Sequence, residues 1–147
     1  MLNDCSGKIA LITGAGTGIG RSCAMALAEA GAVVVVSDID AGTAAETAAL
    51  ITKNGGKARG LGQDVTDEGV WQEVIAGIAD EEGGLNVLVN NAGQMQEIGI
   101  ADMTLAMWQD NLMVNLECFL QNFSQMVPGT IVCLVMEVRQ RIKKLEK

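Results

Sequence analysis

The residues best suited to chemistry begin with a glycine-rich stretch that directly follows a short apolar run, Thr13-Gly14-Ala15-Gly16-Thr17-Gly18-Ile19-Gly20. Glycine suits a place where a strand turns sharply into a helix and the backbone must approach a phosphate closely. The N–H groups at the positive end of that helix can then hold a pyrophosphate. By itself this turn is a weak signal for a phosphate-binding site, because the ordinary dinucleotide spacing G-x-G-x-x-G fails in both registers. The candidate contact residues in the turn are Gly14, Gly16, Thr17, Gly18, Ile19 and Gly20.

Polar residues also follow the next three apolar runs. Asp38 closes the second run, where a carboxylate can accept hydrogen bonds from both hydroxyls of an adenosine ribose and would repel a 2′-phosphate. Asp64-Val65 and Asn90-Asn91-Ala92-Gly93 follow the third and fourth runs. Taken singly, each group could be a strand-end cap or part of a turn. Their order along the chain favours one site built from successive strands.

The elements that must carry these residues alternate between β-branched runs and alanine-rich or amphipathic segments, as in βαβ units. The run Val33 to Val36 is apolar on both faces, as expected for a strand with helices on each side. The sequence predicts a doubly wound parallel α/β sheet of about five strands. Strands are expected at residues 8–13, 32–37, 57–61, 86–90 and 130–136. Helices are expected at residues 19–30, 41–54, 67–82 and 102–126, and Gly55-Gly56 and Gly83-Gly84 should end two of them.

Composition narrows the classes of function. The 147 residues, 49% of them hydrophobic, are enough for one domain with a core that needs no disulfide or metal. The net charge of −8 and the lack of a basic stripe in the body make nucleic acid and anionic membranes poor partners. The apolar runs are far shorter than the ~20 residues of a spanning helix. Residues 1–6 lack a signal-peptide layout, so we expect a cytoplasmic protein.

The chain contains no histidine and no tyrosine, which limits the chemistry of its side chains. Its four cysteines, Cys5, Cys23, Cys118 and Cys133, have no C-x-x-C spacing. Zinc sites and serine–histidine triads therefore lack ligands or bases, and we expect no metal. We interpret the thiols as small buried hydrophobes in a reducing compartment.

The last residues differ in composition from the rest. Residues 137–147 hold five of the ten Lys and Arg residues, and Val135, Val138, Ile142 and Leu145 form an apolar stripe at helical spacing. We divide the chain into a dinucleotide-binding domain, residues 1–136, and a basic amphipathic tail, residues 137–147, expected to be helical. The stripe could pack back on the domain or form a coiled-coil contact.

The glycine spacing T-G-x-x-x-G-x-G, followed by Asp38, Asp64-Val65 and Asn-Asn-Ala-Gly at 90–93, resembles the short-chain dehydrogenase/reductase family over residues 7–134. The resemblance implies a Rossmann-like domain that binds a nicotinamide dinucleotide and moves hydride between it and an alcohol or ketone. It implies NAD, because no basic residue occupies Ala15, Thr17 or Ile39, where NADP-preferring members often carry one.

The resemblance also assigns roles to single residues. Asp64 would face the adenine amine beside Val65, and Asn91 would lie against the cofactor while Asn90 ties strands together. Ile39, Ala92 and Gly93 complete the expected cofactor-binding set. Asn115, within Val114-Asn115-Leu116, matches the asparagine of the family's catalytic set, whose backbone helps to hold a water in a proton relay.

The helix that carries Asn115 is apolar nearly all round. Its apolar residues are Leu112, Val114, Leu116, Phe119, Leu120 and Phe123. We expect this helix to be buried on most sides. We also expect a homo-oligomer, formed through this helix and the edge of the fifth strand, which would otherwise expose unpaired backbone groups.

The resemblance ends where the rest of the catalytic set should begin. Met136 stands where family members carry serine, and the Tyr-x-x-x-Lys pair would come after Lys147. We therefore expect a chain truncated relative to the family, with activity severely impaired or absent. Three interpretations stay open: an NAD-dependent oxidoreductase by descent, a catalytically silent NAD-binding or interaction module, and a frameshifted or spliced fragment of an active enzyme.

Overall fold

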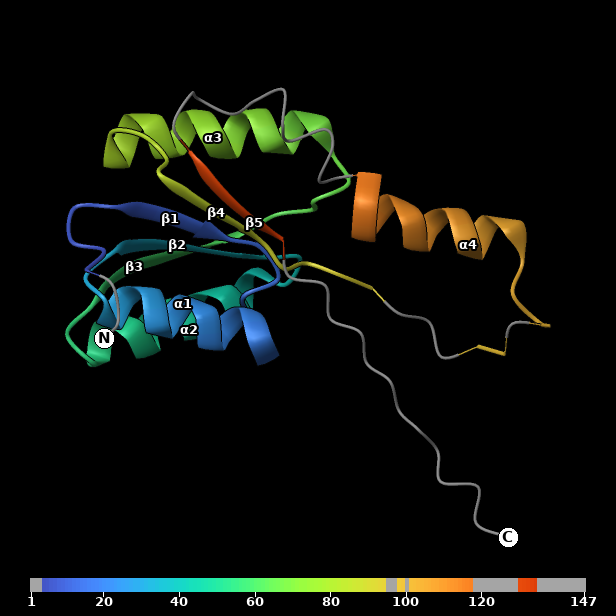
Figure 1. Cartoon of the computed structure of the whole chain (residues 1–147), viewed down its shortest axis with the longest axis horizontal. Helices are drawn as coiled ribbons and strands as arrows, with labels where there is room; N and C mark the ends of the chain where they lie inside the picture. The colour runs from blue at the N-terminus through green and yellow to red at the C-terminus, as the bar shows by residue number, and fades with distance from the viewer. Residues whose placement is uncertain (1–3, 95–97, 100, 118–129, 135–147) are drawn as a thin grey trace, which may run out of the picture.

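A computed structural model describes residues 4–94, 98–99, 101–117 and 130–134, and it shows a parallel sheet between layers of helix (Figure 1). The strands are β1 (Ile9–Ile12), β2 (Val33–Asp38), β3 (Lys57–Gly62), β4 (Val87–Asn90) and β5 (Ile131–Leu134). Their order is β3-β2-β1-β4-β5, and every neighbouring pair is parallel. The prediction of a doubly wound parallel sheet is confirmed.

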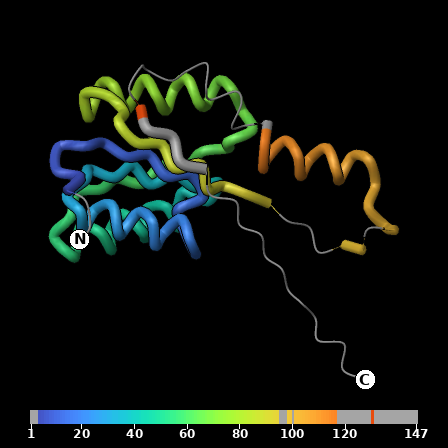
Figure 2. The backbone as a smooth tube through the Cα atoms, viewed as in Figure 1, coloured from blue at the N-terminus to red at the C-terminus, as the bar shows by residue number. Residues whose placement is uncertain are grey.

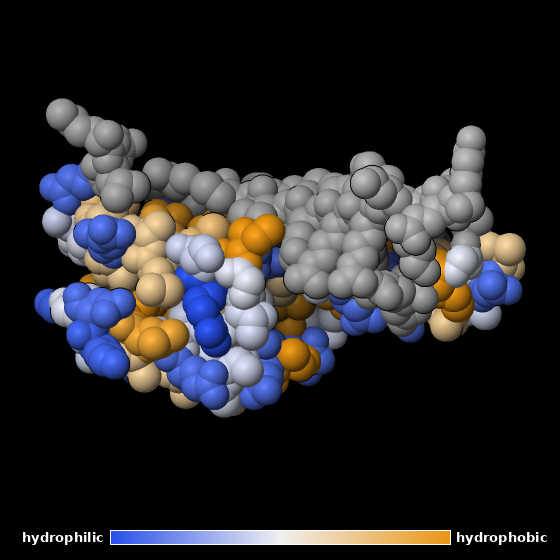
Figure 3. Space-filling model, turned by 90° about the horizontal axis from the view of Figure 1, so that it is seen from below, coloured by the Kyte–Doolittle hydropathy of each residue, from blue (hydrophilic) through white to orange (hydrophobic). Residues whose placement is uncertain are grey.

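Helices cover both faces of this sheet. Helices α1 (Gly18–Glu29) and α2 (Ala41–Lys53) lie on one face, and α3 (Glu68–Glu82) lies on the other (Figure 1). Helix α4 (Leu105–Leu112) continues into η1 (Met113–Glu117), a π-helical turn. The face that carries α1 and α2 shows hydrophilic and hydrophobic residues interspersed over its described surface (Figure 3).

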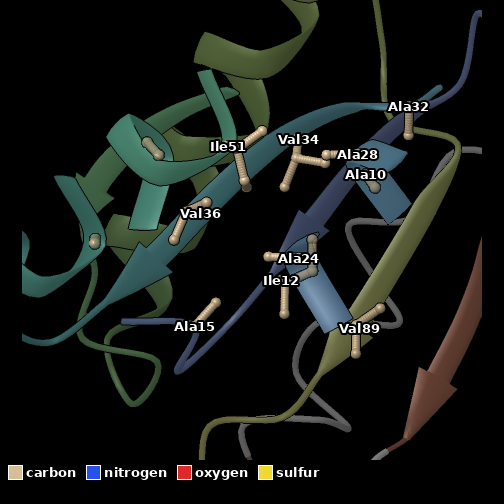
Figure 4. Packing of buried hydrophobic residues seen from close by; sticks show 12 residues of the cluster. Ala10, Ile12, Ala15, Ala24, Ala28, Ala32, Val34, Val36, Ile51 and Val89 are labelled. Carbon is tan, nitrogen blue, oxygen red and sulfur yellow. The ribbon is translucent and has the colours of Figure 1, made fainter. Parts of the chain in front are cut away.

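The strands form because their residues alternate between two apolar layers. Ala10, Ile12, Val34 and Val36 pack with Ala24 and Ala28 of α1 (Figure 4). Leu11, Val35 and Leu88 pack on the opposite face with Trp71 of α3. Apolar residues on both faces explain why the β2 run shows no polar alternation.

Close approach between α2 and β3 requires glycine at one point. A Cβ at Gly60 would lie 2.7 Å from the backbone of Ala44, which is closer than real Cβ contacts. Small side chains on α2 and glycine on β3 thus let the helix lie directly on the strand.

The glycines predicted to end two helices have the expected conformation. Gly83 is the C-cap of α3 with φ 88°, and Gly55, with φ 87°, directly follows the C-cap of α2, Asn54. This left-handed conformation is open to glycine and costly for residues with a Cβ.

Gly83→Ala is expected to lower the free energy of unfolding by ~1 kcal/mol, because alanine must adopt the left-handed conformation. Gly77→Ala is the matched control. Gly77 lies inside α3, and a Cβ added there would meet open space. Alanine at this position should therefore raise the free energy of unfolding by ~0.5–1 kcal/mol. Urea unfolding followed by circular dichroism measures both. Equal effects of the two substitutions would contradict the role of Gly83 as a left-handed cap.

The predicted helix 102–126 differs most from the structure. Its described part comprises α4 and η1, and residues 118–126 lie outside the described residues. No residue of α4 is buried, and the exposed fractions of Leu105 and Trp108 are 71% and 52%. The expectation of burial on most sides is wrong for this part, because α4 lies beside the sheet and not over it (Figures 1 and 2).

Other expectations fall outside the described residues. These are the end of the fifth strand at 135–136, the tail at 137–147 and Cys118. Cys5 and Cys23 are half-buried, and Cys5 packs against the apolar core, so the interpretation of these two thiols as buried hydrophobes is only partly right. Within the described residues, no helix is long and apolar enough to cross a membrane.

Candidate functional site

The segments singled out from the sequence meet at the carboxyl edge of the sheet. In a parallel sheet the loops after neighbouring strands lie side by side at this edge. Ala15 N–H donates to Ser37 O (2.9 Å), which joins the glycine turn to β2. Gln63 N–H donates to Asp38 O (2.8 Å), which joins the end of β3 to β2. The glycine turn and the ends of β2 and β3 are thus joined along this edge.

The glycines of the turn after β1 are required by close packing. Gly14 and Gly18 have φ values of 61° and 56°. A Cβ at Gly14 would lie 2.8 Å from Ala92 Cα. At Gly20, a Cβ would fall on Asn91 Nδ2 and on Gly14 O. The turn therefore packs directly against the loop after β4.

Asn91 ties these two loops together. Its backbone N–H donates to Thr13 Oγ1 (3.1 Å), and its Nδ2 donates to both Thr13 O and Gly14 O (3.0 Å each). Ala92 N–H also donates to Thr13 Oγ1 (3.0 Å). The sequence predicts that Asn90 ties strands together, and that prediction is separate from these bonds of Asn91. A contact of Asn91 with a cofactor stays a prediction.

The N-terminus of α1 differs from those of the other described α-helices. Asp40, Asp67 and Thr104 cap α2, α3 and α4 by accepting backbone N–H groups through their side chains. Thr17 starts α1 without such a bond, and the first turn of α1 has no acidic residue. Thr17, Gly18 and Ile19 are exposed. The positive end of α1 is thus open to an anion from outside.

Asp38 holds the glycine turn against the end of β2. Its Oδ2 accepts Gly16 N–H (2.9 Å), and its Oδ1 accepts Asp40 N–H (3.1 Å). Asp38 therefore caps the end of its strand, which is one of the roles that the sequence allows for this residue. The side chain is half-buried, so the carboxylate still reaches the surface beside the exposed Ile39.

Two residues that the sequence did not single out fix the carbonyl of Gly16. Arg21 Nη2 and Thr47 Oγ1 both donate to Gly16 O, the latter at 3.1 Å, and Arg21 Nε donates to Thr47 Oγ1 (2.9 Å). Thr47 is fully buried. The available signal was a threonine within the alanine-rich α2, where a buried hydroxyl needs a partner.

Asp64 is exposed on the turn after β3. Its Oδ1 accepts both Thr66 N–H (2.9 Å) and the Thr66 hydroxyl (2.7 Å). These bonds hold the pKa of the Asp64 carboxyl below its ordinary value, because they favour the charged form. Val65 is buried, and its carbonyl accepts the indole N–H of Trp71 (2.8 Å).

Asn115 pairs with the loop after β4 through its amide. Its Oδ1 accepts Gln94 N–H (3.0 Å), and its Nδ2 donates to Gln94 O (2.8 Å). The pairing brings the π-helical turn next to Gly93, where a Cβ would lie 2.9 Å from Asn115 Oδ1. Such turns occur frequently at functional sites. The role of the Asn115 backbone in a proton relay stays a prediction.

Among the described residues, no three histidine, cysteine or acidic side chains form a group able to hold a metal ion. The arrangement is instead a polar edge of backbone N–H groups, carboxylates and amides.

Comparison with known proteins gives a consistent picture. The family model described as short chain dehydrogenase matches residues 8–132. The chain is 34% identical over 131 residues to 2,5-dichloro-2,5-cyclohexadiene-1,4-diol dehydrogenase LinX of Sphingobium indicum, covering 89% of this chain and 52% of that protein. It is 40% identical over 100 residues to the short-chain dehydrogenase/reductase homolog YusS of Bacillus subtilis, covering 67% of this chain and 92% of that protein.

A solved structure shares the fold. The short-chain type dehydrogenase/reductase from Mycobacterium marinum superposes with a TM-score of 0.78 at 36% identity, over 82% of this chain and 48% of that one. The chain thus spans about half the length of LinX and of this structure.

Proposed function

The chain belongs to the short-chain dehydrogenase family, and from that membership we propose that it binds NAD(H) at the carboxyl edge of its sheet. By descent it is an oxidoreductase that would act between NAD(H) and an alcohol or ketone. The observation that carries the proposal is the N-terminus of α1, which has no side-chain cap and lies within the glycine turn.

The residues of this edge fit a dinucleotide. The N–H groups at the start of α1 would hold the pyrophosphate, where an anion gains ~0.3–2 kcal/mol from the helix end. Gly18 opens on empty space, so a phosphate could approach the backbone there. Asp38 would hold the ribose, and Asp64 and Val65 the adenine. The cofactor, when bound, supplies or accepts the hydride.

A calorimetric titration with NADH and NADPH tests the proposal. We expect NADH to bind with a micromolar Kd and NADPH much more weakly. Absence of binding by either would mean that the glycine turn and Asp38 do not form a working site in this polypeptide, and the proposal would fail.

Asp38 should set the preference for NAD over NADP. Its charge would lie near a 2′-phosphate, and no basic residue stands at Ala15, Thr17 or Ile39 to offset it. Asp38→Asn should therefore shrink the ratio of the NADPH Kd to the NADH Kd by ~10-fold, which is about 1.4 kcal/mol. Asp67→Asn, the same change at the cap of α3, is the control and should leave the ratio unaltered. An unchanged ratio in Asp38→Asn would refute the assignment.

We propose that the 147-residue polypeptide has little or no turnover. Asn115 is present, but the polypeptide contains no tyrosine, and Met136 stands where the family has serine. Loss of a positioned general acid costs ~10²–10⁴ in rate, and loss of an oxyanion donor a further ~10²–10³. A spectrophotometric assay of NADH oxidation with ketones and aldehydes should find a kcat far below ~1 s⁻¹. A rate near that value would contradict the proposal.

A silent NAD-binding or interaction module is the second candidate. The alignment with YusS covers 92% of that protein, so the same segment makes up nearly all of a short relative. A fragment of a frameshifted or spliced gene is the third. The coding DNA after the codon of Val132 distinguishes the silent module from the fragment. A serine followed by Tyr-x-x-x-Lys in another reading frame would support the fragment.

We propose that copies of the chain associate through α4 and the edge of β5. The exposed apolar residues Leu105 and Trp108 lie on α4, and such residues favour an interface. Trp108→Glu should convert a dimer to monomer at micromolar concentration, measured by sedimentation equilibrium. Gln109→Glu, on the same helix, should not. A wild-type protein that sediments as a clean monomer would rule out this association.

We also propose that the protein works in the cytoplasm. Cys23 is a free thiol, and free thiols persist in a reducing compartment. Thiol titration of protein purified without reductant should find Cys23 reduced.

A further inference from the structure

Asp64 sits on a backbone that is fixed from both sides. On one side, Gln63 N–H donates to Asp38 O and ties this turn to β2. On the other side, Asp67 N–H donates to Asp64 O (3.2 Å), and the indole of Trp71 holds Val65 O (2.8 Å). The remaining freedom of Asp64 is therefore rotation of its side chain.

Thr66 restricts this rotation by donating two hydrogen bonds to the same oxygen of the Asp64 carboxylate. Its N–H and its hydroxyl both donate to Oδ1 of Asp64, at 2.9 and 2.7 Å. Among the described residues, nothing donates to Oδ2, and the Asp64 side chain is exposed. A carboxylate held by one oxygen presents the other in a set direction.

The other carboxylate of the site shows a different arrangement. Asp38 also accepts the N–H of the residue two positions on, Asp40, but its second oxygen is taken by Gly16 N–H. Asp64 is thus the one of the two that keeps an oxygen without a protein donor within the described chain.

The Asp64–Thr66 pair is not needed to start the helix that follows. Helix α3 has its own cap, because Asp67 Oδ1 accepts Val70 N–H (3.1 Å). A purely structural role would leave the Thr66 hydroxyl redundant with the Thr66 N–H, which already closes the turn.

We propose that Thr66 is a positioning residue for adenine, holding Asp64 so that Oδ2 accepts the exocyclic amine of the base. The inference rests on the proposed NAD(H) site. The chemistry selects a 6-amino purine over a 6-oxo purine, because a carboxylate accepts a hydrogen bond from the amine and repels a carbonyl oxygen. The low pKa of Asp64 agrees with this, since the group stays ionised at neutral pH.

The test compares NADH with deamino-NADH, in which hypoxanthine replaces adenine, by calorimetry. Wild type should bind NADH more tightly. Thr66→Val removes the hydroxyl and should raise the NADH Kd by ~3–10-fold, as expected for one hydrogen bond, while the deamino-NADH Kd stays unchanged. Thr66→Ser, which keeps the hydroxyl, should restore the preference. Thr52→Val is the matched control, because the Thr52 hydroxyl donates to Ala48 O (3.0 Å) within α2.

Asp64→Asn gives an independent arm that does not depend on Thr66. Asparagine can keep its oxygen on Thr66 and place its NH₂ group toward the base, so the preference should move to deamino-NADH. Equal losses for both ligands in Thr66→Val, or an unaltered preference in Asp64→Asn, would overturn the inference while NAD(H) binding stands. Failure of wild type to bind either ligand would overturn the proposed function, and this inference with it.

Discussion

Gly20→Ala is expected to abolish detectable NADH binding while leaving the sheet folded. The added Cβ would fall on Asn91 Nδ2 and on Gly14 O, and it would lie 2.8 Å from Ala15 Cα. Two of these three atoms belong to backbone and cannot rotate away. The glycine turn must therefore move away from the loop after β4, and the bond from Asn91 to Gly14 O must lengthen or break.

The expected size follows from the cost of overpacking, ~1–3 kcal/mol, which falls on the atoms that would shape the pyrophosphate site. A displaced turn should raise the Kd for NADH by at least ~100-fold, which corresponds to about 2.7 kcal/mol of binding free energy. The same cost is smaller than the ~5–15 kcal/mol stability of a typical domain, so circular dichroism should still show a folded protein.

Gly77→Ala is the control for Gly20→Ala. Both glycines lie in helices, but a Cβ at Gly77 meets nothing within 4 Å. The Kd of Gly77→Ala for NADH, measured by the same titration, should equal that of the wild-type protein. If Gly20→Ala binds NADH as tightly as wild type, then the turn does not form the phosphate site.

Trp71→Ala should cause the largest loss of stability, ~3–5 kcal/mol, because it empties the space of a large core side chain. The exposed fraction of Trp71 is 1%, and the indole packs on the α3 face of the sheet against Leu11 and Val35. The substitution also leaves Val65 O without its indole donor at the predicted adenine site. Urea unfolding followed by circular dichroism measures the change.

Trp71→Phe separates packing from hydrogen bonding. Phenylalanine fills most of the space but cannot donate to Val65 O, so the loss should be smaller, ~1–3 kcal/mol for an unpaired buried carbonyl. If the urea unfolding midpoints of Trp71→Ala and the wild-type protein coincide, the placement of Trp71 in the core is contradicted.

The sequence by itself predicted the elements of the sheet and the place of the site. Runs such as Val33 to Val36 and the glycine spacing from Gly14 to Gly20 act locally, because strand and helix periodicity and left-handed turns depend on neighbouring residues. Parallel strands then oblige the loops that follow them to lie along one edge. Asp38, Asp64 and Asn91 therefore lie along one edge of the sheet.

The tertiary structure decided which atoms bond within that edge. Asn91 bonds to Thr13 and Gly14, because the end of β4 turns that side chain toward the glycine turn. The pairing of Asn115 with Gln94 and the hold of Thr47 on Gly16 O join residues far apart in the chain. Such contacts depend on strand order and on where helices sit against the sheet, which no local pattern encodes. The exposure of α4 has the same origin, since its apolar residues predicted burial but its position beside the sheet left them exposed.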